Sequence, residues 1–217
     1  MQIEEYIEHT ILRPDATKKD LLKLFAEAKL HKFKGICVNP VHVKLAADEL
    51  KKTSTIIGCV IGFPLGANTT EVKVYEAAIA IRDGAEELDM VMNIGALKDG
   101  DYDAVKKDIS MVKSICTVPL KVIIETDLLT KEEIKIATEL VCDSGADFVK
   151  TSTGFIKNGV GAKVEDVKIM AEIAHAQNVK VKASGGIKNY EDAKNLIEAG
   201  ADRLGTSSGV AIVNEKP

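Results

Sequence analysis

The sequence predicts an α/β fold in which eight parallel strands close into a (β/α)8 barrel, also called a TIM barrel. Three observations lead to this prediction. Short β-rich runs alternate with amphipathic helical runs along the whole chain. A Gly-Ala-acid step recurs where helical runs end, which indicates a repeated building block. No linker or low-complexity stretch interrupts the pattern, so we expect residues 1–217 to form a single domain, with a short N-terminal helix.

Eight runs have the composition of strands. Each is short, rich in apolar or β-branched residues, and separated from the next by a helical pattern. In chain order they are 9–12 (HTIL, the weakest), 35–38 (GICV), 56–61 (IIGCVI), 87–92 (ELDMVM), 120–125 (LKVIIE), 147–151 (DFVKT), 179–183 (VKVKA) and 202–206 (DRLGT). Repeated βα units form a parallel sheet with right-handed crossovers. Eight such strands suffice to close a barrel, for which 217 residues is a short chain.

The helical runs carry their own start and stop signals. Apolar residues recur at helical spacing as Val105, Ile109 and Val112, and again as Ile134, Ala137 and Val141. Two N-cap signals pair a threonine with an acidic residue three positions on, namely Thr17 with Asp20 and Thr130 with Glu133. Three helices are expected to end in the junctions DGAEELD, SGADFVK and AGADRLG, at Gly84, Gly145 and Gly200.

The alternative architecture is an open, doubly wound sheet. That fold would carry a glycine fingerprint for a dinucleotide directly after its first strand. After the run GICV the chain continues NPVHV, which contains no glycine. The barrel is therefore favoured.

Composition and charge narrow the class of partner. Hydrophobic residues make up 46% of the chain, aromatic residues only 4%, and Trp is absent. Such a core is built from Val, Ile, Leu and Ala, which suits parallel strands buried on both faces. The net charge is −4 and no basic stripe with interleaved aromatics occurs, so nucleic acid is not an expected partner. A small phosphorylated substrate is compatible with this charge, because a few backbone amides can hold one phosphate.

The cysteines, the histidines and the start of the chain give further expectations. Cys37, Cys59, Cys116 and Cys142 lie far apart without a CxxC pair, so we expect free thiols in a reducing cytosol. Cys37 could face the cavity, but a buried small hydrophobe is the simpler role. The four histidines have no HxH or HExxH spacing, so no metal site is expected. The start MQIEEYIEHT lacks the apolar region of a signal peptide, and no run reaches membrane-spanning length, so we expect a cytoplasmic protein.

Lys150 is the first candidate catalytic residue. In a barrel of this kind, function gathers at the carboxyl ends of the strands, and Lys150 ends the run FVKTSTG. Side chains alternate along a strand, so Lys150 shares a face with Phe148 while Val149 takes the other. If Val149 packs against the helices, Lys150 points into the barrel. A lone lysine at a strand end is more often a structural ion pair or a surface charge.

Lys182 changes that balance. In VKVKASGG the apolar residues take one face, and Lys182 takes the other near the strand end. The two lysine-bearing strands should be neighbours, which places two inward lysines at one height. At an effective dielectric of about 20, two like charges ~4 Å apart cost roughly 4 kcal/mol, or ~3 pKa units. A purely structural site would avoid that repulsion. An enzyme that needs a neutral amine would use it, because one ammonium lowers the pKa of the other.

Asp89 supplies a carboxylate to the same region. In ELDMVMN it shares a face with Val91, and an unpaired buried charge would be costly. An inward lysine is the natural partner, and a carboxylate beside two lysines could also orient them and relay protons. Lys121 and Glu125 share a face of their own run, and we expect them to extend this network in a structural role.

Two small-residue turns are candidate phosphate sites. SGGI at 184–187 and GTSSG at 205–209 each follow a predicted strand, and the second opens a last short helix. Small residues expose backbone amides, and this is the usual phosphate position in such barrels. The candidate phosphate-binding residues are Gly154, Gly185, Gly186, Gly205, Ser207 and Ser208.

Taken together, these segments resemble the deoxyribose-phosphate aldolase family. The segments that carry the resemblance are HTILRPDAT, ICVNP, IGFPLG, ELDMVMN, LKVIIET, FVKTSTG, VKASGGI and GTSSG, in collinear order over essentially the whole chain. The combination of VKTSTG with a later KASGGI is much more specific than any single motif.

The resemblance implies a (β/α)8 barrel that needs neither a metal nor an organic cofactor. It implies reversible cleavage of 2-deoxy-D-ribose 5-phosphate to D-glyceraldehyde 3-phosphate and acetaldehyde. Lys150 would form the Schiff base, and Asp89 and Lys182 would transfer protons. Gly185, Gly186, Ser207 and Ser208 match the family's phosphate-binding turns.

Three departures from the family pattern stand out. Many members have Asp where this chain has Glu8, which leaves the role of that position open. The loop after TSTGF is usually glycine-rich, whereas here it reads IKNGVGAK. Some members carry a C-terminal tail that reaches the site, whereas this chain ends NEKP.

Two rival functions remain at this level. One is another phosphate-binding barrel enzyme with transaldolase-like or sugar-phosphate isomerase activity. The other is a barrel that binds a sugar phosphate without catalysis, although a mere binder gains nothing from paired inward lysines. Barrels of this type often form dimers or tetramers, so we expect a homo-oligomer.

Overall fold

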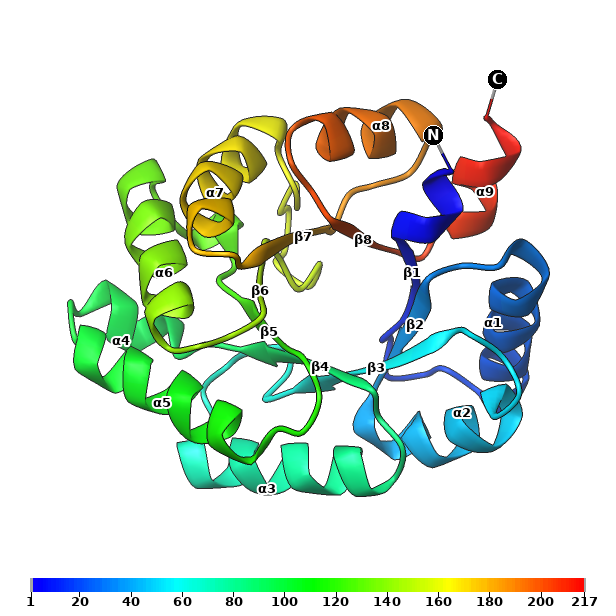
Figure 1. The fold of residues 1–217 in the computed structure, drawn as a ribbon, viewed down its shortest axis with the longest axis horizontal. Helices are drawn as coiled ribbons and strands as arrows, with labels where there is room; N and C mark the ends of the chain where they lie inside the picture. The colour runs from blue at the N-terminus through cyan, green and yellow to red at the C-terminus, as the bar shows by residue number, and fades with distance from the viewer. Residues whose placement is uncertain (1, 217) are drawn as a thin grey trace.

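The computed structural model describes residues 2–216 and contains a closed barrel of eight parallel strands. Each strand pairs with the next in chain order, and β8 pairs with β1 to close the ring. Seen along its short axis, the molecule is a ring of strands surrounded by helices (Figure 1). The predicted (β/α)8 barrel is confirmed, and the closed strand order excludes the doubly wound alternative. Positions 1 and 217, the ends of the predicted domain, lie outside the described residues.

The element bounds follow the predicted alternation. The strands are β1 (Ile7–Ile11), β2 (Gly35–Val38), β3 (Ile56–Ile61), β4 (Glu87–Val91), β5 (Leu120–Ile123), β6 (Phe148–Lys150), β7 (Lys180–Ser184) and β8 (Arg203–Thr206). The α-helices are α1 (Lys18–His31), α2 (Val43–Leu50), α3 (Thr70–Arg82), α4 (Ile94–Lys98), α5 (Tyr102–Ile115), α6 (Lys131–Asp143), α7 (Val164–Ala176), α8 (Tyr190–Glu198) and α9 (Gly209–Asn214). Three short 3-10 helices are η1 (Ile3–Tyr6), η2 (Pro40–His42) and η3 (Thr126–Leu128).

Two boundaries differ from the prediction in an informative way. The weakest run, 9–12, belongs to a strand that begins earlier, at Ile7, and the short N-terminal helix is the single 3-10 turn η1. The run 120–125 is a strand only to Ile123. Glu125 has φ 60° and ψ 68°, a left-handed conformation that cannot continue a strand.

The predicted helix signals are confirmed. Thr17 and Thr130 each accept a hydrogen bond from the backbone N–H three residues on, and the acidic side chain at that position accepts one from the backbone N–H of the threonine. The junction glycines have positive φ, with 110° at Gly84, 77° at Gly145 and 111° at Gly200. These values suit glycine, which lacks the Cβ that opposes such a backbone.

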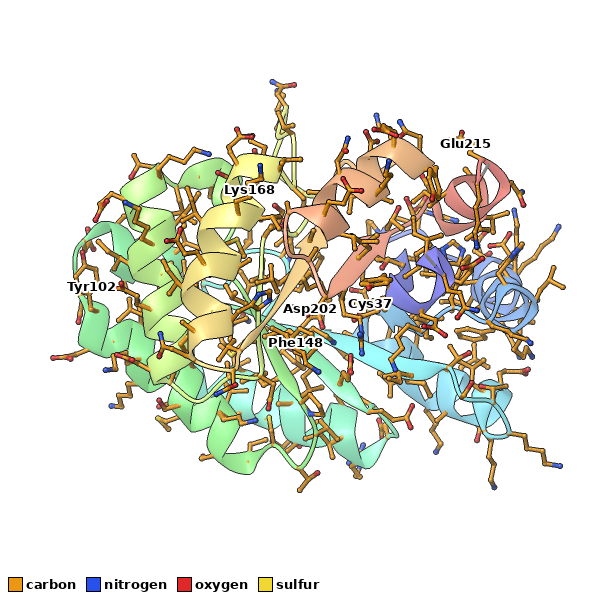
Figure 2. All side chains as sticks on the ribbon, turned by 45° about the horizontal axis from the view of Figure 1, so that its top comes forward. Cys37, Tyr102, Phe148, Lys168, Asp202 and Glu215 are labelled. Atoms are coloured by element: carbon orange, nitrogen blue, oxygen red, sulfur yellow. The ribbon has the colours of Figure 1, made fainter. Side chains whose placement is uncertain are left out.

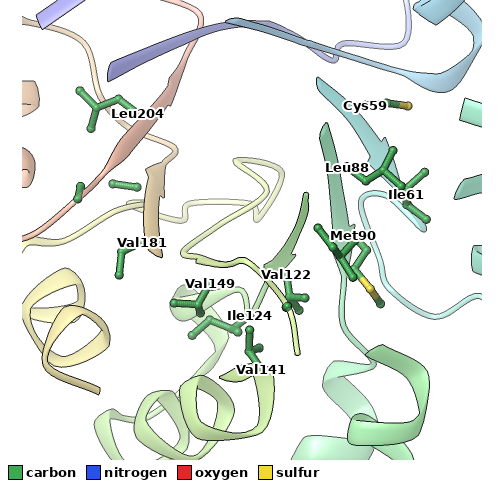
Figure 3. Packing of buried hydrophobic residues seen from close by; sticks show 14 of the residues in the cluster. Cys59, Ile61, Leu88, Met90, Val122, Ile124, Val141, Val149, Val181 and Leu204 are labelled. Atoms are coloured by element: carbon green, nitrogen blue, oxygen red, sulfur yellow. The ribbon is translucent and has the colours of Figure 1, made fainter. Parts of the chain in front are cut away.

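The two faces of the strands have different chemistry. Leu88, Met90, Val122, Val149 and Val181 are fully buried between the strands and the helices (Figure 3). Each Å² of apolar surface buried contributes about 25 cal/mol, and this burial stabilises the outer layer. Because side chains alternate, the residues between these positions point into the barrel.

The barrel interior contains an unusual proportion of charge. Lys121 and Lys182 are fully buried there, and the Phe148 ring lies 5.6 Å from the Lys121 ammonium. Figure 2 places Cys37 and Phe148 inside the ring of helices, whereas Tyr102 and Lys168 lie on outer helices. Within residues 2–216, no helix has both the length and the apolar character needed to cross a bilayer.

Candidate active site

Strand register brings the two candidate lysines together. Lys150 on β6 is the direct partner of Lys182 on β7, so the two lie at one height as predicted. Asp89 on β4 is likewise the direct partner of Lys121 on β5. Four ionisable side chains from four consecutive strands therefore converge inside the barrel.

Asp89 is the centre of this cluster. Its Oδ2 accepts hydrogen bonds from Lys150 Nζ at 2.6 Å and from Lys182 Nζ at 2.7 Å, and its Oδ1 accepts one from Lys121 Nζ at 3.0 Å. Because one oxygen bonds both Lys150 and Lys182, their nitrogens lie within about 5 Å of each other, close enough for strong repulsion if both are charged. Burial alone would raise the pKa of Asp89, but the three lysines hold it well below its usual range.

Glu8 and Glu87 complete the charge balance. Glu8 on β1 forms an ion pair with Lys182 and lies 3.5 Å from Lys121 Nζ, while Glu87 lies 2.5 Å from the same Lys121 nitrogen. Burial alone would lower the pKa of Lys182, but Asp89 and Glu8 raise it above its usual value. Lys182 therefore stays an ammonium ion at neutral pH.

Glu8, the position whose role the sequence left open, thus belongs to this buried cluster. Glu8 is 1% exposed, and the Coulombic attraction of Lys121 and Lys182 outweighs burial to lower its pKa. Its partner Lys182 lies 174 positions away in the chain. Only closure of the barrel, which sets β1 beside β8, brings β1 near enough to β7 for this contact.

Lys150 is the one lysine of the cluster that lines a cavity. A cavity of about 620 Å³ opens at the carboxyl ends of the strands, and of the three clustered lysines only Lys150 lines it. Lys121 and Lys182 have no exposed surface, whereas Lys150 is 3% exposed. The cluster therefore presents one amine to the cavity and keeps the other two behind it.

The predicted phosphate residues line the same cavity. All six contribute to its wall, namely Gly154, Gly185, Gly186, Gly205, Ser207 and Ser208. Gly185 and Gly186 have φ values of 84° and 74°, a backbone conformation that other residues rarely adopt. The cavity thus has an amine in its wall and turns of small residues in the same wall.

One cation near these turns escaped the sequence analysis. Lys188 lines this cavity and also a neighbouring one of about 470 Å³, next to Gly185 and Gly186. The available signal was its position two residues after the glycine pair in SGGIK. A basic residue there suits an anionic ligand.

Glu125 does not join the lysine cluster, and that expectation is wrong in this respect. Lys121 does extend the cluster as expected, through Glu87 and Asp89. The carboxylate of Glu125 instead accepts hydrogen bonds from the N–H and hydroxyl of Thr153. The physical reason is its left-handed backbone, which breaks the strand alternation on which the prediction depended.

Cys37 lies beside the cluster but does not line the cavity. Its thiol points at Asp89, with Sγ 3.9 Å from Oδ2, and burial raises its pKa to about 11. All four cysteines are free thiols. Among residues 2–216, no three His, Cys, Asp or Glu side chains are grouped to hold a metal ion.

Comparison with known proteins agrees with this geometry. Residues 5–215 match the model of the DeoC/LacD family aldolases. The chain is 54% identical over 214 residues to the deoxyribose-phosphate aldolase of Staphylococcus carnosus, covering 98% of this chain and 96% of that protein. It is 56% identical over 218 residues to the deoxyribose-phosphate aldolase of Thermococcus gammatolerans, with the same coverage.

A solved structure gives the same result for the fold. The deoxyribose phosphate aldolase of Aeropyrum pernix superposes with a TM-score of 0.89 at 34% identity, covering 98% of this chain and 89% of that one. Family model, sequence relatives and structure each span nearly the whole barrel. The chain therefore belongs to the DeoC/LacD family of aldolases.

Proposed function

We propose that this protein is a class I deoxyribose-phosphate aldolase. It reversibly cleaves 2-deoxy-D-ribose 5-phosphate to D-glyceraldehyde 3-phosphate and acetaldehyde through a Schiff base on Lys150. The observation that carries the proposal is that Lys150, the one lysine of the buried cluster that lines the cavity, is hydrogen-bonded at 2.6 Å to a carboxylate that also binds the buried ammonium of Lys182. The family assignment and the activity named for the two sequence relatives support the substrate.

Imine formation is the first step. Lys150 transfers a proton to Asp89 and attacks the C1 aldehyde of the open-chain sugar as a neutral amine. The carbinolamine oxygen is protonated from the Asp89–Lys182 pair and leaves as water. The product is a protonated imine, which withdraws electrons from the adjacent carbon. Because the lysine itself supplies this electron sink, the reaction needs no organic cofactor.

Cleavage and release follow from the same groups. Removal of the C3 hydroxyl proton, by way of water to the Asp89 carboxylate, lets the C2–C3 bond break. Its electron pair moves into the imine to give an enamine, and glyceraldehyde 3-phosphate departs. The enamine takes a proton at C2 from the Lys182 side, and water hydrolyses the imine to release acetaldehyde. Each proton that is taken up in one step is returned in another.

The phosphate end of the substrate provides orientation. The six small residues in the cavity wall include the two hydroxyls of Ser207 and Ser208, and Lys188 adds a positive charge. Binding of the non-reacting phosphate holds C1 against Lys150, which converts binding energy into orientation.

Two measurements test the proposal. Acetaldehyde release from 2-deoxyribose 5-phosphate should be abolished in Lys150→Ala and unchanged in Lys168→Ala, a matched change at an exposed lysine on α7. Borohydride added with acetaldehyde should leave a two-carbon adduct on Lys150, located by peptide mass spectrometry. An active preparation without that adduct would refute the Schiff-base assignment. Preferential turnover of ribulose or fructose phosphates would favour the rival barrel activities.

The proposal extends to assembly and location. The Aeropyrum pernix relative is described as tetrameric, and we expect a homo-oligomer, a dimer or a tetramer, for this chain as well. Light scattering on the purified protein would decide between these and a monomer. The four free cysteines suit a reducing cytoplasm, which cell fractionation would test.

A further inference from the structure

A short segment after β5 holds the loop that follows β6. Glu125 is 1% exposed, and its carboxylate accepts hydrogen bonds from the Thr153 N–H at 3.2 Å and from the Thr153 hydroxyl. Thr153 directly precedes Gly154, which lines the cavity. Glu125 reaches this position with a left-handed backbone, a conformation that costs a non-glycine residue conformational energy. Such a conformation persists where surrounding contacts over-determine it.

Asp127, two residues later, holds the other end of the same loop. Its Oδ2 accepts the Gly161 N–H at 2.7 Å, and its Oδ1 lies 3.4 Å from Lys163 Nζ. A Cβ at Gly159 would lie 2.7 Å from Asp127 Oδ2, so the loop backbone fits closely around this carboxylate. Two carboxylates from one short segment therefore fix both ends of the loop over residues 154–163.

The loop in turn lies directly against the glycine pair of the phosphate turn. Ala162 N–H donates to the Gly185 carbonyl at 3.1 Å, and a Cβ at Gly161 would come within 2.4 Å of the Gly185 carbonyl group. A Cβ at Gly186 would lie 2.2 Å from the Val160 carbonyl oxygen. Backbone packs on backbone here, so a shift of the loop would displace the turn.

We propose that Glu125 and Asp127 are positioning residues that hold the loop over residues 154–163 and, through it, the glycine turn that receives the substrate phosphate. This inference rests on the proposed function. Neither carboxylate forms a hydrogen bond with Lys150, Asp89 or Lys182, and the contacts of Asp127 lie on Gly161 and Lys163, at the end of the loop that packs on the glycine turn.

The test compares a phosphorylated with an unphosphorylated substrate. In Asp127→Ala and Glu125→Ala we expect the KM for 2-deoxyribose 5-phosphate to rise about tenfold to a hundredfold, since each change removes acceptors on which the loop depends. The kcat for that substrate and the KM for 2-deoxyribose should change less than about threefold. Asp127→Asn should recover most of the loss, because its amide oxygen can still accept the Gly161 N–H. Glu132→Gln, a charge change on the exposed start of α6, is the matched control.

The outcomes separate this inference from the proposed function. A wild-type protein that cleaves neither sugar and forms no acetaldehyde adduct on Lys150 would overturn the proposed function. An active wild type whose Asp127→Ala form keeps its KM for the phosphorylated sugar would overturn the inference alone. Equal loss on both sugars would also overturn it, since a general folding defect does not distinguish them. If Glu125→Ala does not fold, Asp127→Ala and Asp127→Asn still test the inference.

Discussion

Replacement of Lys182 by leucine should cost stability and turnover together. The ammonium has no exposed surface and lies between Glu8 and the Asp89 oxygen 2.7 Å away. Without it, Asp89 keeps Lys121 and Lys150, but the nearest remaining cations to Glu8 are Lys121 at 3.5 Å and Arg203 at 3.9 Å. Loss of one partner from a buried ion pair destabilises a protein by about 3–5 kcal/mol.

The loss of unfolding free energy in Lys182→Leu can be separated from its loss of turnover. A typical domain has about 5–15 kcal/mol of unfolding free energy, so Lys182→Leu should stay folded at 25 °C while its urea midpoint falls. Because the chain has no Trp, far-ultraviolet circular dichroism is the appropriate probe. Turnover should fall by about 100- to 10,000-fold, the usual contribution of a general acid or base.

A double variant distinguishes charge balance from catalysis. Glu8→Gln combined with Lys182→Leu removes one buried charge of each sign, so it should recover most of the lost unfolding free energy. It should recover none of the turnover, since the proton donor is still missing. The charge-balance argument is refuted if the unfolding free energy of Lys182→Leu lies within about 1 kcal/mol of the wild-type value, or if the double variant regains turnover.

Three further expectations follow from the same contacts. The pKa values of Glu8 and Asp89 are lowered on folding, so the stability that they contribute is present above about pH 4.5 and is lost as the pH falls through their folded values. The urea midpoint should therefore fall below about pH 4.5, and a midpoint that stays constant down to about pH 3 would contradict this. Gly186→Ala, at φ 74° and against the Val160 carbonyl, should raise the KM for 2-deoxyribose 5-phosphate, and an unchanged KM would argue against a close-packed turn. Thr130→Ala removes a capping box and should lower the unfolding free energy by about 1 kcal/mol with kcat unaltered, as melts and assays on one preparation would show.

The sequence by itself determined the fold and the direction of the key side chains. Alternation along a strand is a local property of the backbone, so the inward position of Lys150, Lys182 and Asp89 followed once the strands were identified. Helix caps and junction glycines are equally local, because they depend on hydrogen bonds and φ values within a few residues. The small-residue turns followed from their places after the last two strands.

Only the tertiary structure decided which charged side chains pair with each other. Barrel closure sets Glu8 on the first strand beside Lys182 on the seventh, and long flexible side chains can choose among several partners within reach. It also decided that Lys150 alone of the clustered lysines meets the cavity, since exposure depends on everything packed around it. Glu125 left the strand pattern because a left-handed residue redirects its side chain, and no periodicity in the sequence records such a turn.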